Sequence, residues 1–377
     1  MQNKILFVVN TDTFFVSHRM AIALAAQEKG FEVHLATQFS SKQKLIENAG
    51  IKIHSIGIDR KSINIASNIN LFFRLLFLFK KLRPQIVHLI TQKPIILGGL
   101  AARVSGVDSI IISIAGLGYI WTNKKFNTLI LKKIIMIIYR TIFYHENIFF
   151  IFQNKEDRSQ LLQNFDIDIK KTTLTNGSGV NLEYFKRKHA VPNKKLVITF
   201  ASRLLISKGI LDFISAAKIL NEKYDHLSFW ITGAPDEGNP DSLSLTDIEN
   251  LKKNSFLKFH GNVTNMKRIF QKTSIFCLPS YYGEGIPKVL LEAAASGLPI
   301  ITSDHPGCRE AIIHGRSGFL VKTKNPNSIV TEIEKLISNK DLIRKFGKSS
   351  AKLAKEKFSI ETVINKHLKI YNKLKYF

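Results

Sequence analysis

NGSGVNLEYFKRKHAVPNKK, the stretch from Asn176 to Lys195, interrupts an otherwise regular sequence pattern. It is rich in Gly, Asn and Lys, and Pro192 lies near its end. On either side of it, short apolar runs alternate with longer segments of helical periodicity. Such alternation is typical of parallel sheets with helices on both faces. The sequence therefore predicts an α/β fold with two doubly wound domains.

The predicted elements fall into two sets, one before and one after this stretch. Strands are predicted at Ile5–Val9, Glu32–Thr37, Lys52–Ile56, Gln85–Ile90, Ser109–Ile114, Ile148–Phe152, Thr172–Thr175, Leu196–Ala201, Leu227–Thr232, Ile275–Leu278, Pro299–Ser303 and Gly318–Val321. Helices are predicted at Ser17–Lys29, Ile63–Leu82, Ile95–Val104, Asn127–Tyr144, Lys155–Asn164, Gly209–Tyr224, Pro287–Ser296 and Ile360–Tyr376.

Three parts of the chain follow from this pattern. We expect Rossmann-like domains over residues 1–185 and 186–358, and a C-terminal helix over 359–377 that is long enough to cross back to the first domain. Ligands of doubly wound sheets bind outside the carboxyl ends of the strands. With two such sheets, the expected site is the cleft between them.

Composition excludes several classes of protein. The chain has 377 residues, of which 45% are hydrophobic and 10% aromatic, so intrinsic disorder is excluded. Its two cysteines, Cys277 and Cys308, exclude a disulfide scaffold and a four-cysteine zinc site, and fit a reducing compartment. The opening MQNKILFVVNTDTFF is too short for a signal peptide and lacks a small-residue cleavage site, so none is expected.

The positive charge is concentrated in two blocks. The formal net charge is +26, and residues 60–145 contribute +12 and residues 322–377 contribute +9. The stretch from 146 to 321 is nearly balanced. A charge excess that is confined in this way favours an anionic surface or ligand over a general compositional bias.

The first basic block is also the most apolar part of the chain. NLFFRLLFLFKKLRP (Asn70 to Pro84) and FNTLILKKIIMIIYRTIFYH (Phe126 to His145) interleave Leu, Ile and Phe with Arg and Lys. Neither has the ~20 uncharged residues that a spanning helix needs. Basic, aromatic amphipathic helices on an anionic membrane surface are the functional interpretation. The alternative is that both helices pack on a sheet and their basic residues form a solvated face.

PSYYGEGIPKVLLEAAASGLPIITSDHPGCREAI, Pro279 to Ile312, carries the strongest chemical signal. A strand, a Gly-containing loop and a helix follow one another, which places backbone N–H groups and the positive end of a helix at the carboxyl edge of a strand, suited to a phosphate. Glu284 precedes the helix and Glu292 lies two turns into it. Carboxylates beside a phosphate site suit sugar hydroxyls. The alternative for Glu292 is a buried structural acid.

A pair of cations follows the first strand of the second domain. In FASRLLISKGILDF, Arg203 and Lys208 lie five residues apart, before the predicted helix at Gly209. Arg supplies a planar fork and Lys a point charge, and both can bind a diphosphate. A basic pair at a helix start is usually solvated, but this one occupies the strand-end loop equivalent to the one that holds Glu284.

Together these motifs resemble the retaining family 4 glycosyltransferases of the GT-B fold. The resemblance covers nearly the whole chain and is carried by Arg203-x4-Lys208, Glu284-Gly285-Ile286-Pro287, Glu284-x7-Glu292, Ser296-Gly-Leu-Pro299, Asn176-Gly177, Gly315-x2-Gly318 and the opening FVVNTDTFFVSHRMAIALAAQEKGFEVHLAT. It implies that Arg203 and Lys208 bind the donor diphosphate, with the loop residues Gly285, Ile286 and Pro287 beside them. Glu292 would hold the ribose, and Glu284 would contact the donor sugar near its reacting carbon.

The resemblance also implies a mechanism and partners. The family's front-face mechanism needs no protein nucleophile, so Glu284, Arg203 and Lys208 would act on the nucleotide-sugar alone, with no metal or other cofactor. Two further segments, Trp230 to Ser244 and Ser113 to Phe126, resemble enzymes that extend undecaprenyl-diphosphate-linked oligosaccharides in O-antigen (lipopolysaccharide), capsule or glycoprotein glycan assembly. We therefore expect a UDP-sugar donor, a polyprenyl-diphosphate glycan acceptor and a cytoplasmic protein peripherally bound to the inner face of the cell membrane, where the first domain binds the acceptor and the second the donor.

The first domain departs from the family pattern in two places. The first loop is Asn10-Thr-Asp-Thr-Phe14 where many members have Gly-Gly, and Ala115 stands where several have His or Glu before the Gly-Leu-Gly turn. The remaining acceptor or cleft candidates are polar residues or glycines near these loops: Asp12, Ser17, His18, Arg19, Gly116 and Gly118. Ser17 has the alternative role of capping a helix that begins there, and His18 that of local packing.

Other signals are weaker. Asp166-Ile-Asp168 fits a surface turn better than a metal site, Gly177-Ser-Gly179 lacks the rest of a dinucleotide fingerprint, and neither cysteine is expected to be catalytic. The histidines and cysteines show no metal-ligand spacing. Two alternatives to a glycosyltransferase are open: a sugar-nucleotide epimerase on the same fold, and a nucleic-acid-binding protein indicated by charge alone. The Arg/Lys pair with the two Glu argues against the first, and the apolar character of the basic blocks against the second.

Overall fold

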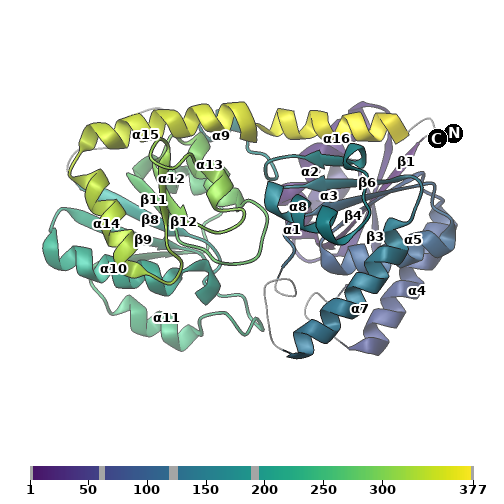
Figure 1. Ribbon diagram of the computed structural model, residues 1–377, viewed down its shortest axis with the longest axis horizontal. Coiled ribbons are helices and arrows are strands. Elements are labelled where there is room, and N and C mark those ends of the chain that lie inside the picture. The colour runs from purple at the N-terminus through teal and green to yellow at the C-terminus, as the bar shows by residue number, and fades with distance from the viewer. Residues whose placement is uncertain (1–2, 59–63, 119–125, 188–194, 375–377) are drawn as a thin grey trace. The chain divides into compact units, whose positions relative to one another are not determined.

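A computed structural model describes residues 3–58, 64–118, 126–187 and 195–374, with the backbone alone for 126–130. The chain forms two compact units (Figure 1): Met1–Ser178 with Ile360–Phe377, and Gly179–Ser359. Each unit is a parallel sheet covered by helices, so the predicted α/β, doubly wound fold is confirmed.

The first unit contains a seven-stranded sheet in the order β3-β2-β1-β4-β5-β6-β7. Its strands are β1 Lys4–Thr11, β2 Glu32–Gln38, β3 Lys52–Ser55, β4 Ile86–Ile90, β5 Ser109–Ile114, β6 Ile148–Phe152 and β7 Thr172–Leu174. Its helices are α1 Asp12–His18, α2 Met20–Glu28, α3 Gln43–Asn48, α4 Ile65–Leu82, η1 Pro94–Gly98, α5 Gly99–Ser105, α7 Phe126–Phe143, α8 Lys155–Asn164, η2 Ile169–Lys171 and α16 Ile360–Leu374.

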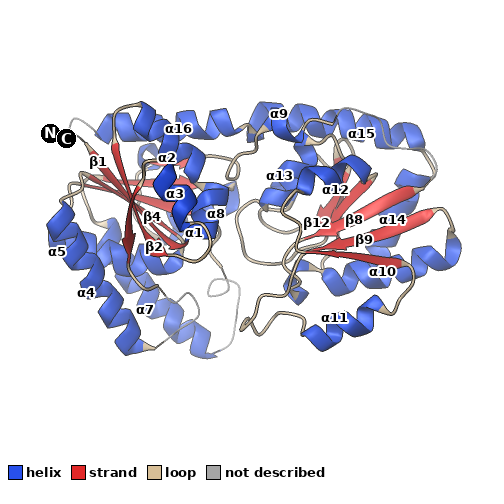
Figure 2. Ribbon diagram, turned by 180° about the vertical axis from the view of Figure 1, so that it is seen from behind, coloured by secondary structure: helices blue, strands red, loops and turns tan. Residues whose placement is uncertain are grey.

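Both faces of this sheet are buried, which explains why its strands read as continuous apolar runs. Successive residues of β1 point to opposite faces: Leu6 and Val8 pack with α4, α5 and α7, whereas Ile5 and Phe7 pack with α1, α2 and α16. Figures 1 and 2 both show α4, α5 and α7 as one layer. All the strands pair in parallel, for example Phe7 of β1 opposite Leu35 of β2.

The C-terminal helix α16 belongs to the first unit, although it follows the second in sequence. Buried Tyr371 of α16 shares a 2.8 Å hydrogen bond with Nδ1 of His88 on β4, and Nε2 of His88 lies 2.6 Å from Oγ of Ser113 on β5. Lys366 Nζ donates to the carbonyl of Leu174 at the end of β7. The helix is therefore fixed to the sheet by buried polar contacts as well as apolar packing.

The second unit contains a six-stranded sheet in the order β10-β9-β8-β11-β12-β13. Its strands are β8 Leu196–Ala201, β9 Leu227–Thr232, β10 Leu257–Gly261, β11 Ile275–Leu278, β12 Ile300–Ser303 and β13 Gly318–Val321. Its helices are α9 Leu182–Phe185, η3 Ile206–Lys208, α10 Ile210–Lys223, α11 Leu245–Lys252, α12 Met266–Lys272, α13 Lys288–Ala295, η4 Arg309–Ala311, α14 Pro326–Ile337, α15 Lys340–Leu353 and η5 Ala354–Phe358.

The strand order of the second unit fixes where a ligand can bind. The chain leaves β8 toward β9 on one side, while β11 pairs with β8 on the other. The loops that follow β8 and β11 therefore diverge at the carboxyl edge of the sheet, which is the topological switch point where doubly wound folds bind ligands. Arg203 and Lys208 lie in the first of these loops and Glu284 in the second.

The structure corrects one helix of the first unit. The predicted helix Ser17–Lys29 is two helices, α1 and α2, with a break at Arg19. The N-cap of α1 is Thr11, whose Oγ1 accepts from Phe14 N at 3.3 Å. The proposed capping role of Ser17 is wrong, because Ser17 lies in the last turn of α1 and donates to the carbonyl of Thr13.

Candidate active site

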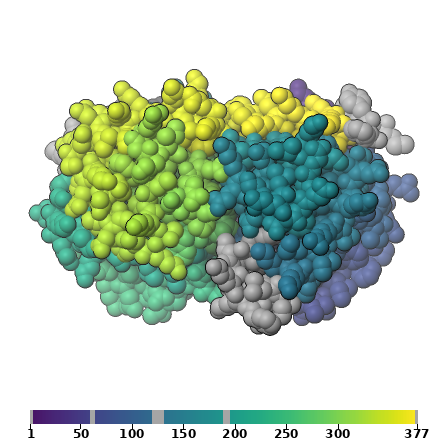
Figure 3. All heavy atoms as spheres, viewed as in Figure 1, coloured from purple at the N-terminus to yellow at the C-terminus, as the bar shows by residue number. Residues whose placement is uncertain are grey.

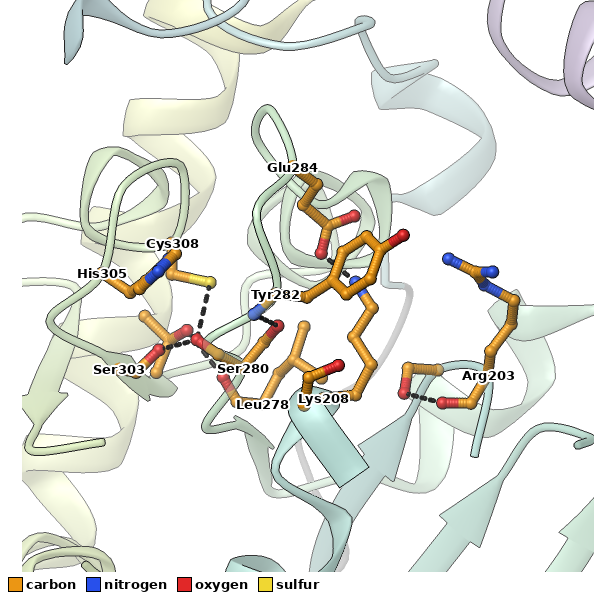
Figure 4. Close-up of polar contacts among 12 residues, drawn as sticks. Arg203, Lys208, Leu278, Ser280, Tyr282, Glu284, Ser303, His305 and Cys308 are labelled. Atoms are coloured by element: carbon orange, nitrogen blue, oxygen red, sulfur yellow. Dashed lines mark hydrogen bonds and ion pairs between the residues drawn. The ribbon is translucent and has the colours of Figure 1, made fainter. Parts of the chain in front are cut away.

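Lys208 and Glu284, from neighbouring strand-end loops, form an ion pair in the second unit (Figure 4). The Lys208 side chain is 6% exposed and that of Glu284 is 23% exposed. Lys208 ends the short helix η3, and Gly209 follows it with φ +78°. A Cβ on Gly209 would lie 2.3 Å from the carbonyl oxygen of Pro279, so the two loops meet at a position that only glycine can occupy.

Burial sets the protonation of Lys208. It lowers the pKa of Lys208 to about 7 from an ordinary 10.5, while the charge of Arg203 acts in the same direction. Cys308 acts against this shift. A carboxylate in contact with an amine, such as Glu284 in its ion pair with Lys208, also favours the ammonium form. Lys208 is therefore a cation that gains or loses its proton near neutral pH.

Tyr282 is a site residue that the sequence reasoning missed. Its ring centroid lies 4.9 Å from Lys208 Nζ and 5.6 Å from Arg203 Cζ, so the same ring contacts both cations. Figure 4 shows the ring beside the Lys208–Glu284 pair, with Arg203 on its far side. The only available sequence signal was the Tyr281-Tyr282 pair, which Gly283 separates from Glu284.

The other predicted cation, Arg203, forms an ion pair with Asp236, a residue that the sequence did not indicate as part of the site. Arg203 Nη1 donates to Oδ2 of Asp236 at 2.5 Å, and Asp236 lies in the loop that follows β9. The sequence predicted that Arg203 and Lys208 lie close together, and the structure brings both to the ring of Tyr282.

The loop before α13 is closely packed against neighbouring backbone. Pro287 is the N-cap of this helix and Ile286 before it is buried. Gly307, with φ +81°, packs against this loop: a Cβ there would lie 2.2 Å from the carbonyl oxygen of Gly285. The helix begins at Lys288, so its positive end lies next to the loop that carries Glu284.

Glu292 lies on α13 one turn beyond its first residue, Lys288, and not two turns into the helix as expected. Its side chain is only partly exposed. Burial raises the pKa of Glu292 to about 7, and the Lys288 charge acts against that shift. A carboxyl group of this kind accepts hydrogen bonds from hydroxyls most strongly once it is ionised. The site therefore contains an acid and a cation that both titrate near pH 7.

Two candidates of the first unit have structural partners. Asp12 is buried, and its carboxylate accepts from the backbone N–H groups of Ser40 and Lys42 at 2.8 Å each. Burial opposes its ionisation, but these hydrogen bonds outweigh that effect and lower the pKa of Asp12. Arg19 is also buried, its Nη1 donates to the carbonyl of His18, and its Nε has no hydrogen-bond partner among the described residues.

The other first-unit candidates lie in two places. Ser17 Oγ is 2.6 Å from Nδ1 of His18, whose ring stacks on Phe14 at a centroid distance of 4.3 Å. Gly116 and Gly118 have φ of +111° and +75°. They therefore form a turn that favours glycine.

A further missed residue, Gln92, holds this glycine turn. Gln92 Nε2 donates to the carbonyls of Gly116 and Leu117, both at 3.3 Å. The hydroxyl of buried Tyr139 donates to Gln92 Oε1. Most of the expected Ser113–Phe126 segment beyond this turn, residues 119–125, lies outside the described residues.

Neither cysteine is exposed. Cys277 and Cys308 are both buried, and burial raises the pKa of each thiol. Across the described ranges, no three His, Cys, Asp or Glu side chains gather in a way that could hold a metal ion.

Both halves of the chain match known families, and the fold matches solved structures. A family model described as glycosyl transferases group 1 matches residues 182–353, and one described as glycosyl transferase 4-like matches residues 4–154. The structure resembles that of a glycosyltransferase from Rickettsia africae (TM-score 0.79, 19% identity, 99% of this chain and 98% of that chain) and that of HepE from Anabaena in complex with UDP and glucose (TM-score 0.79, 15% identity, 98% and 99%).

Two relatives of known activity align with much of the chain. The N,N'-diacetylbacillosaminyl-diphospho-undecaprenol alpha-1,3-N-acetylgalactosaminyltransferase of Campylobacter jejuni is 26% identical over 98% of this chain and 99% of its own length. The UDP-Gal:alpha-D-GlcNAc-diphosphoundecaprenol alpha-1,3-galactosyltransferase of Escherichia coli is 26% identical over 75% of this chain and 74% of its own. With a GT-B fold and a glycosyltransferase family model matched in each of its two halves, the chain is a glycosyltransferase.

Proposed function

We propose that this enzyme is a retaining glycosyltransferase of surface polysaccharide assembly. It moves a hexose or N-acetylhexosamine-type sugar from a UDP-linked donor to a polyprenyl-diphosphate-linked sugar. The observation that carries the proposal is the buried Lys208–Glu284 pair at the switch point of the second sheet, with Arg203 beside it. It joins two cations suited to a diphosphate with a carboxylate suited to a sugar hydroxyl.

The relatives support the choice of donor and acceptor. The names of the Campylobacter and Escherichia enzymes both specify a diphospho-undecaprenol-linked sugar as acceptor, and the second specifies a UDP-sugar donor. The Anabaena neighbour, of the same fold, was solved with UDP. We extend these properties to this chain.

The proposed mechanism uses the site residues without a protein nucleophile. The bond between the anomeric carbon of the donor and its phosphate oxygen breaks, and an acceptor hydroxyl oxygen bonds to that carbon on the same face. The hydroxyl proton passes to the departing diphosphate. Arg203, Lys208 and the positive end of α13 stabilise the charge that develops on the diphosphate, a preorganised electrostatic contribution of the kind that usually dominates catalysis. Glu284 orients the sugar near its reacting carbon, and Glu292 holds the ribose.

An acceptor-dependence assay tests this function. The purified enzyme is incubated with a panel of nucleotide sugars, with and without an undecaprenyl-diphosphate-linked sugar, and the release of nucleoside diphosphate is measured. We expect UDP release from one UDP-sugar, and only when the acceptor is present. Conversion of the donor sugar to its epimer without acceptor would instead establish an epimerase and overturn the proposal.

Donor affinity is expected to be highest near pH 7. As the pH rises through about 7, Lys208 loses the proton that makes it a cation, so binding weakens on the alkaline side. As the pH falls through about 7, Glu292 becomes protonated and loses its anionic oxygens, so binding weakens on the acid side. Calorimetric titration with the UDP-sugar that supports transfer, between pH 5.5 and 8.5 (a range of about 1.5 units either side), measures this profile.

Two single variants test which residue causes the loss of donor affinity on each side of pH 7. Lys208→Met is expected to remove the alkaline limb, and Glu292→Gln the acid limb, each at the cost of weaker binding overall. A UDP-sugar serves better than UDP, because its diphosphate has no terminal phosphate that titrates in this range. A flat profile in the wild-type enzyme would contradict the proposed roles of both residues.

We further propose that the enzyme docks on an anionic membrane through the first unit. The exposed side of α4 carries Ile65, Ile69, Phe73 and Phe77, which are 48% to 75% exposed and spaced four residues apart. This spacing places them along one side of the helix. We call these four residues the α4 stripe.

The helix layer around the α4 stripe extends this apolar surface and carries charge. On α7, which packs on the same face of the sheet, Leu131, Ile134 and Ile137 are exposed. The described side chains of α7 form part of the surface in Figure 3. Arg74, Lys80 and Lys81 on α4 are also exposed, so lipid headgroups of negative charge are the occupants that this surface suits. Among the described helices, none is both long and apolar enough to cross a bilayer.

Vesicle flotation tests the docking proposal. The wild-type enzyme is expected to float with vesicles that contain phosphatidylglycerol at low salt, and to be released as the salt concentration rises. Replacing Phe73 and Phe77 together by serine should weaken binding about tenfold or more, because two exposed aromatic anchors are lost. Leu245→Ser is the matched control, since Leu245 is 68% exposed but lies in the second unit. An enzyme that stays in the bottom fraction at low salt would overturn the proposal.

A further inference from the structure

The loop that follows β9, residues 233–244, is attached along its length to the loop that carries both cations. Leu204 N donates to the carbonyl of Ala234 at 2.9 Å, and Leu243 N donates to the carbonyl of Leu204 at 2.9 Å. Ile206 N donates to the carbonyl of Asp241 at 2.8 Å. We call residues 233–244 the clamp loop, because it runs beside Arg203 and η3 as an added strand would.

The first residue of the clamp loop fixes how closely the two loops approach. Gly233 has φ +141°, and a Cβ at this position would lie 1.7 Å from the carbonyl oxygen of Ser202. Only glycine fits between the loops at this point. The position of the clamp loop relative to Arg203 is therefore set by backbone contacts.

Other residues of the clamp loop fix the position of Asp236, which also contacts Arg203. Its Oδ2 accepts from Nδ2 of Asn239 at 3.1 Å, and its backbone N donates to Oγ of Ser242 at 2.9 Å. The same Oδ2 accepts from Nη1 of Arg203 at 2.5 Å. The carboxylate is 15% exposed, whereas the Arg203 side chain is 38% exposed. The mostly buried carboxylate of Asp236, which is fixed by its own loop, therefore holds Nη1 of the partly exposed Arg203 guanidinium group.

A second acid of the clamp loop, Asp241, accepts hydrogen bonds from the residue before Lys208. Asp241 Oδ2 accepts from the backbone N of Ser207 at 3.1 Å and from its hydroxyl. Ser207 directly precedes Lys208 within η3. The clamp loop therefore holds the backbone at the position next to Lys208 and the side chain of Arg203 at the same time.

We propose that Asp236 is a positioning residue for donor binding, which acts through Arg203. This inference rests on the proposed function, in which Arg203 binds the donor diphosphate. Asp236 contacts Nη1 of Arg203, and no hydrogen bond to another described residue takes Nε or Nη2. These two donors can bind the phosphate oxygens in the fork geometry that Arg uses. A guanidinium group that is already oriented loses less freedom when the diphosphate binds. The negative charge of Asp236 opposes the diphosphate, but across a solvent-exposed guanidinium this repulsion is strongly screened.

A double-mutant cycle on UDP binding tests the proposal. Dissociation constants for UDP are measured by calorimetry for the wild-type enzyme, Asp236→Ala, Arg203→Ala and the double variant. We expect Asp236→Ala to weaken UDP binding about tenfold in the wild-type background, and by less than about twofold when Arg203 is already alanine. Asp236→Asn keeps an acceptor oxygen for Nη1 and should recover binding to within about threefold of wild type.

Each alternative outcome has a separate meaning. Equal losses in both backgrounds would show that Asp236 merely supports the loop, and tighter UDP binding by Asp236→Ala would show that it competes with the diphosphate for Arg203; either result overturns the proposal. Glu334→Ala, which removes the partner of Lys223 (3.1 Å) elsewhere in the second unit, is the control and should leave UDP binding unchanged. A wild-type enzyme that binds no UDP would count against the proposed function instead.

Discussion

Replacing Glu284 by alanine is expected to lower the rate of glycosyl transfer by about a thousandfold or more. Glu284 is the partner of buried Lys208, and in the proposed mechanism it also contacts the donor sugar. Loss of one preorganised electrostatic group in an active site costs about 10²–10³ in kcat. Without the carboxylate the pKa of Lys208 should fall further, so that the cation needed for the diphosphate is also lost at neutral pH.

The same change should leave the second unit folded. Removing one member of a buried ion pair can destabilise a protein by about 3–5 kcal/mol. Lys208 avoids much of this penalty, because it can release its proton near pH 7 and remain buried as a neutral amine. Initial rates of transfer and thermal unfolding by circular dichroism measure the two effects. Glu284→Gln, which keeps the shape of the side chain, should also be nearly inactive, whereas near-wild-type turnover of either variant would contradict the assignment.

A matched control comes from an exposed acid of the same unit. Glu249 pairs with Lys252 on α11 at 2.7 Å, and both side chains are well exposed. Such surface pairs contribute about 0–1 kcal/mol. Glu249→Ala should therefore change neither turnover nor stability by a measurable amount.

Replacing Gly209 by alanine is expected to destabilise the second unit by about 3–5 kcal/mol and to abolish donor binding. Its φ of +78° disfavours any L side chain, and the added Cβ would lie 2.3 Å from the carbonyl oxygen of Pro279. Because the obstacle is backbone, no side-chain rotation relieves it. The loop that carries Lys208 must then move away from the loop that carries Glu284. Thermal unfolding and UDP titration report the two losses.

Gly315→Ala separates the effect of conformation from that of contact. Gly315 has φ +72°, similar to Gly209, but a Cβ there would meet nothing within 4 Å. We expect its replacement to destabilise the protein by only about 1–2 kcal/mol and to leave UDP binding unchanged. Equal effects at both glycines would contradict the claim that the two site loops are held in contact at Gly209.

Elements with a strong apolar pattern were predictable from the sequence. Strands such as β5 and β6 are fully buried, and their Ile- and Phe-rich runs have the observed bounds. The prediction missed β10 at Leu257–Gly261, because its residues after Leu257 are largely exposed and carry no apolar run. It also missed short or polar helices such as α3, α11 and α12, where a single turn or two gives little periodicity.

The candidate site was predictable only where motif residues lie next to regular elements. Lys208 and Glu284 could be expected to meet, because both follow strands whose carboxyl ends share one sheet edge. Asp236 could not be predicted, since it lies in a loop whose path depends on the Gly233 contact with Ser202. The hydrogen bonds of Asp12 with the backbone of Ser40 and Lys42 were also beyond prediction, because those residues lie in a separate loop.

The central claim is that this chain transfers a sugar from a nucleotide donor to a lipid diphosphate-linked sugar. Mass spectrometry of the lipid product, after incubation with undecaprenyl-diphosphate-linked acceptor and a UDP-sugar panel, tests it most directly. The account predicts a product heavier by one sugar residue with the wild-type enzyme, and no product with Glu284→Ala. An acceptor of unchanged mass with every nucleotide sugar, or the same product from both enzymes, would contradict it.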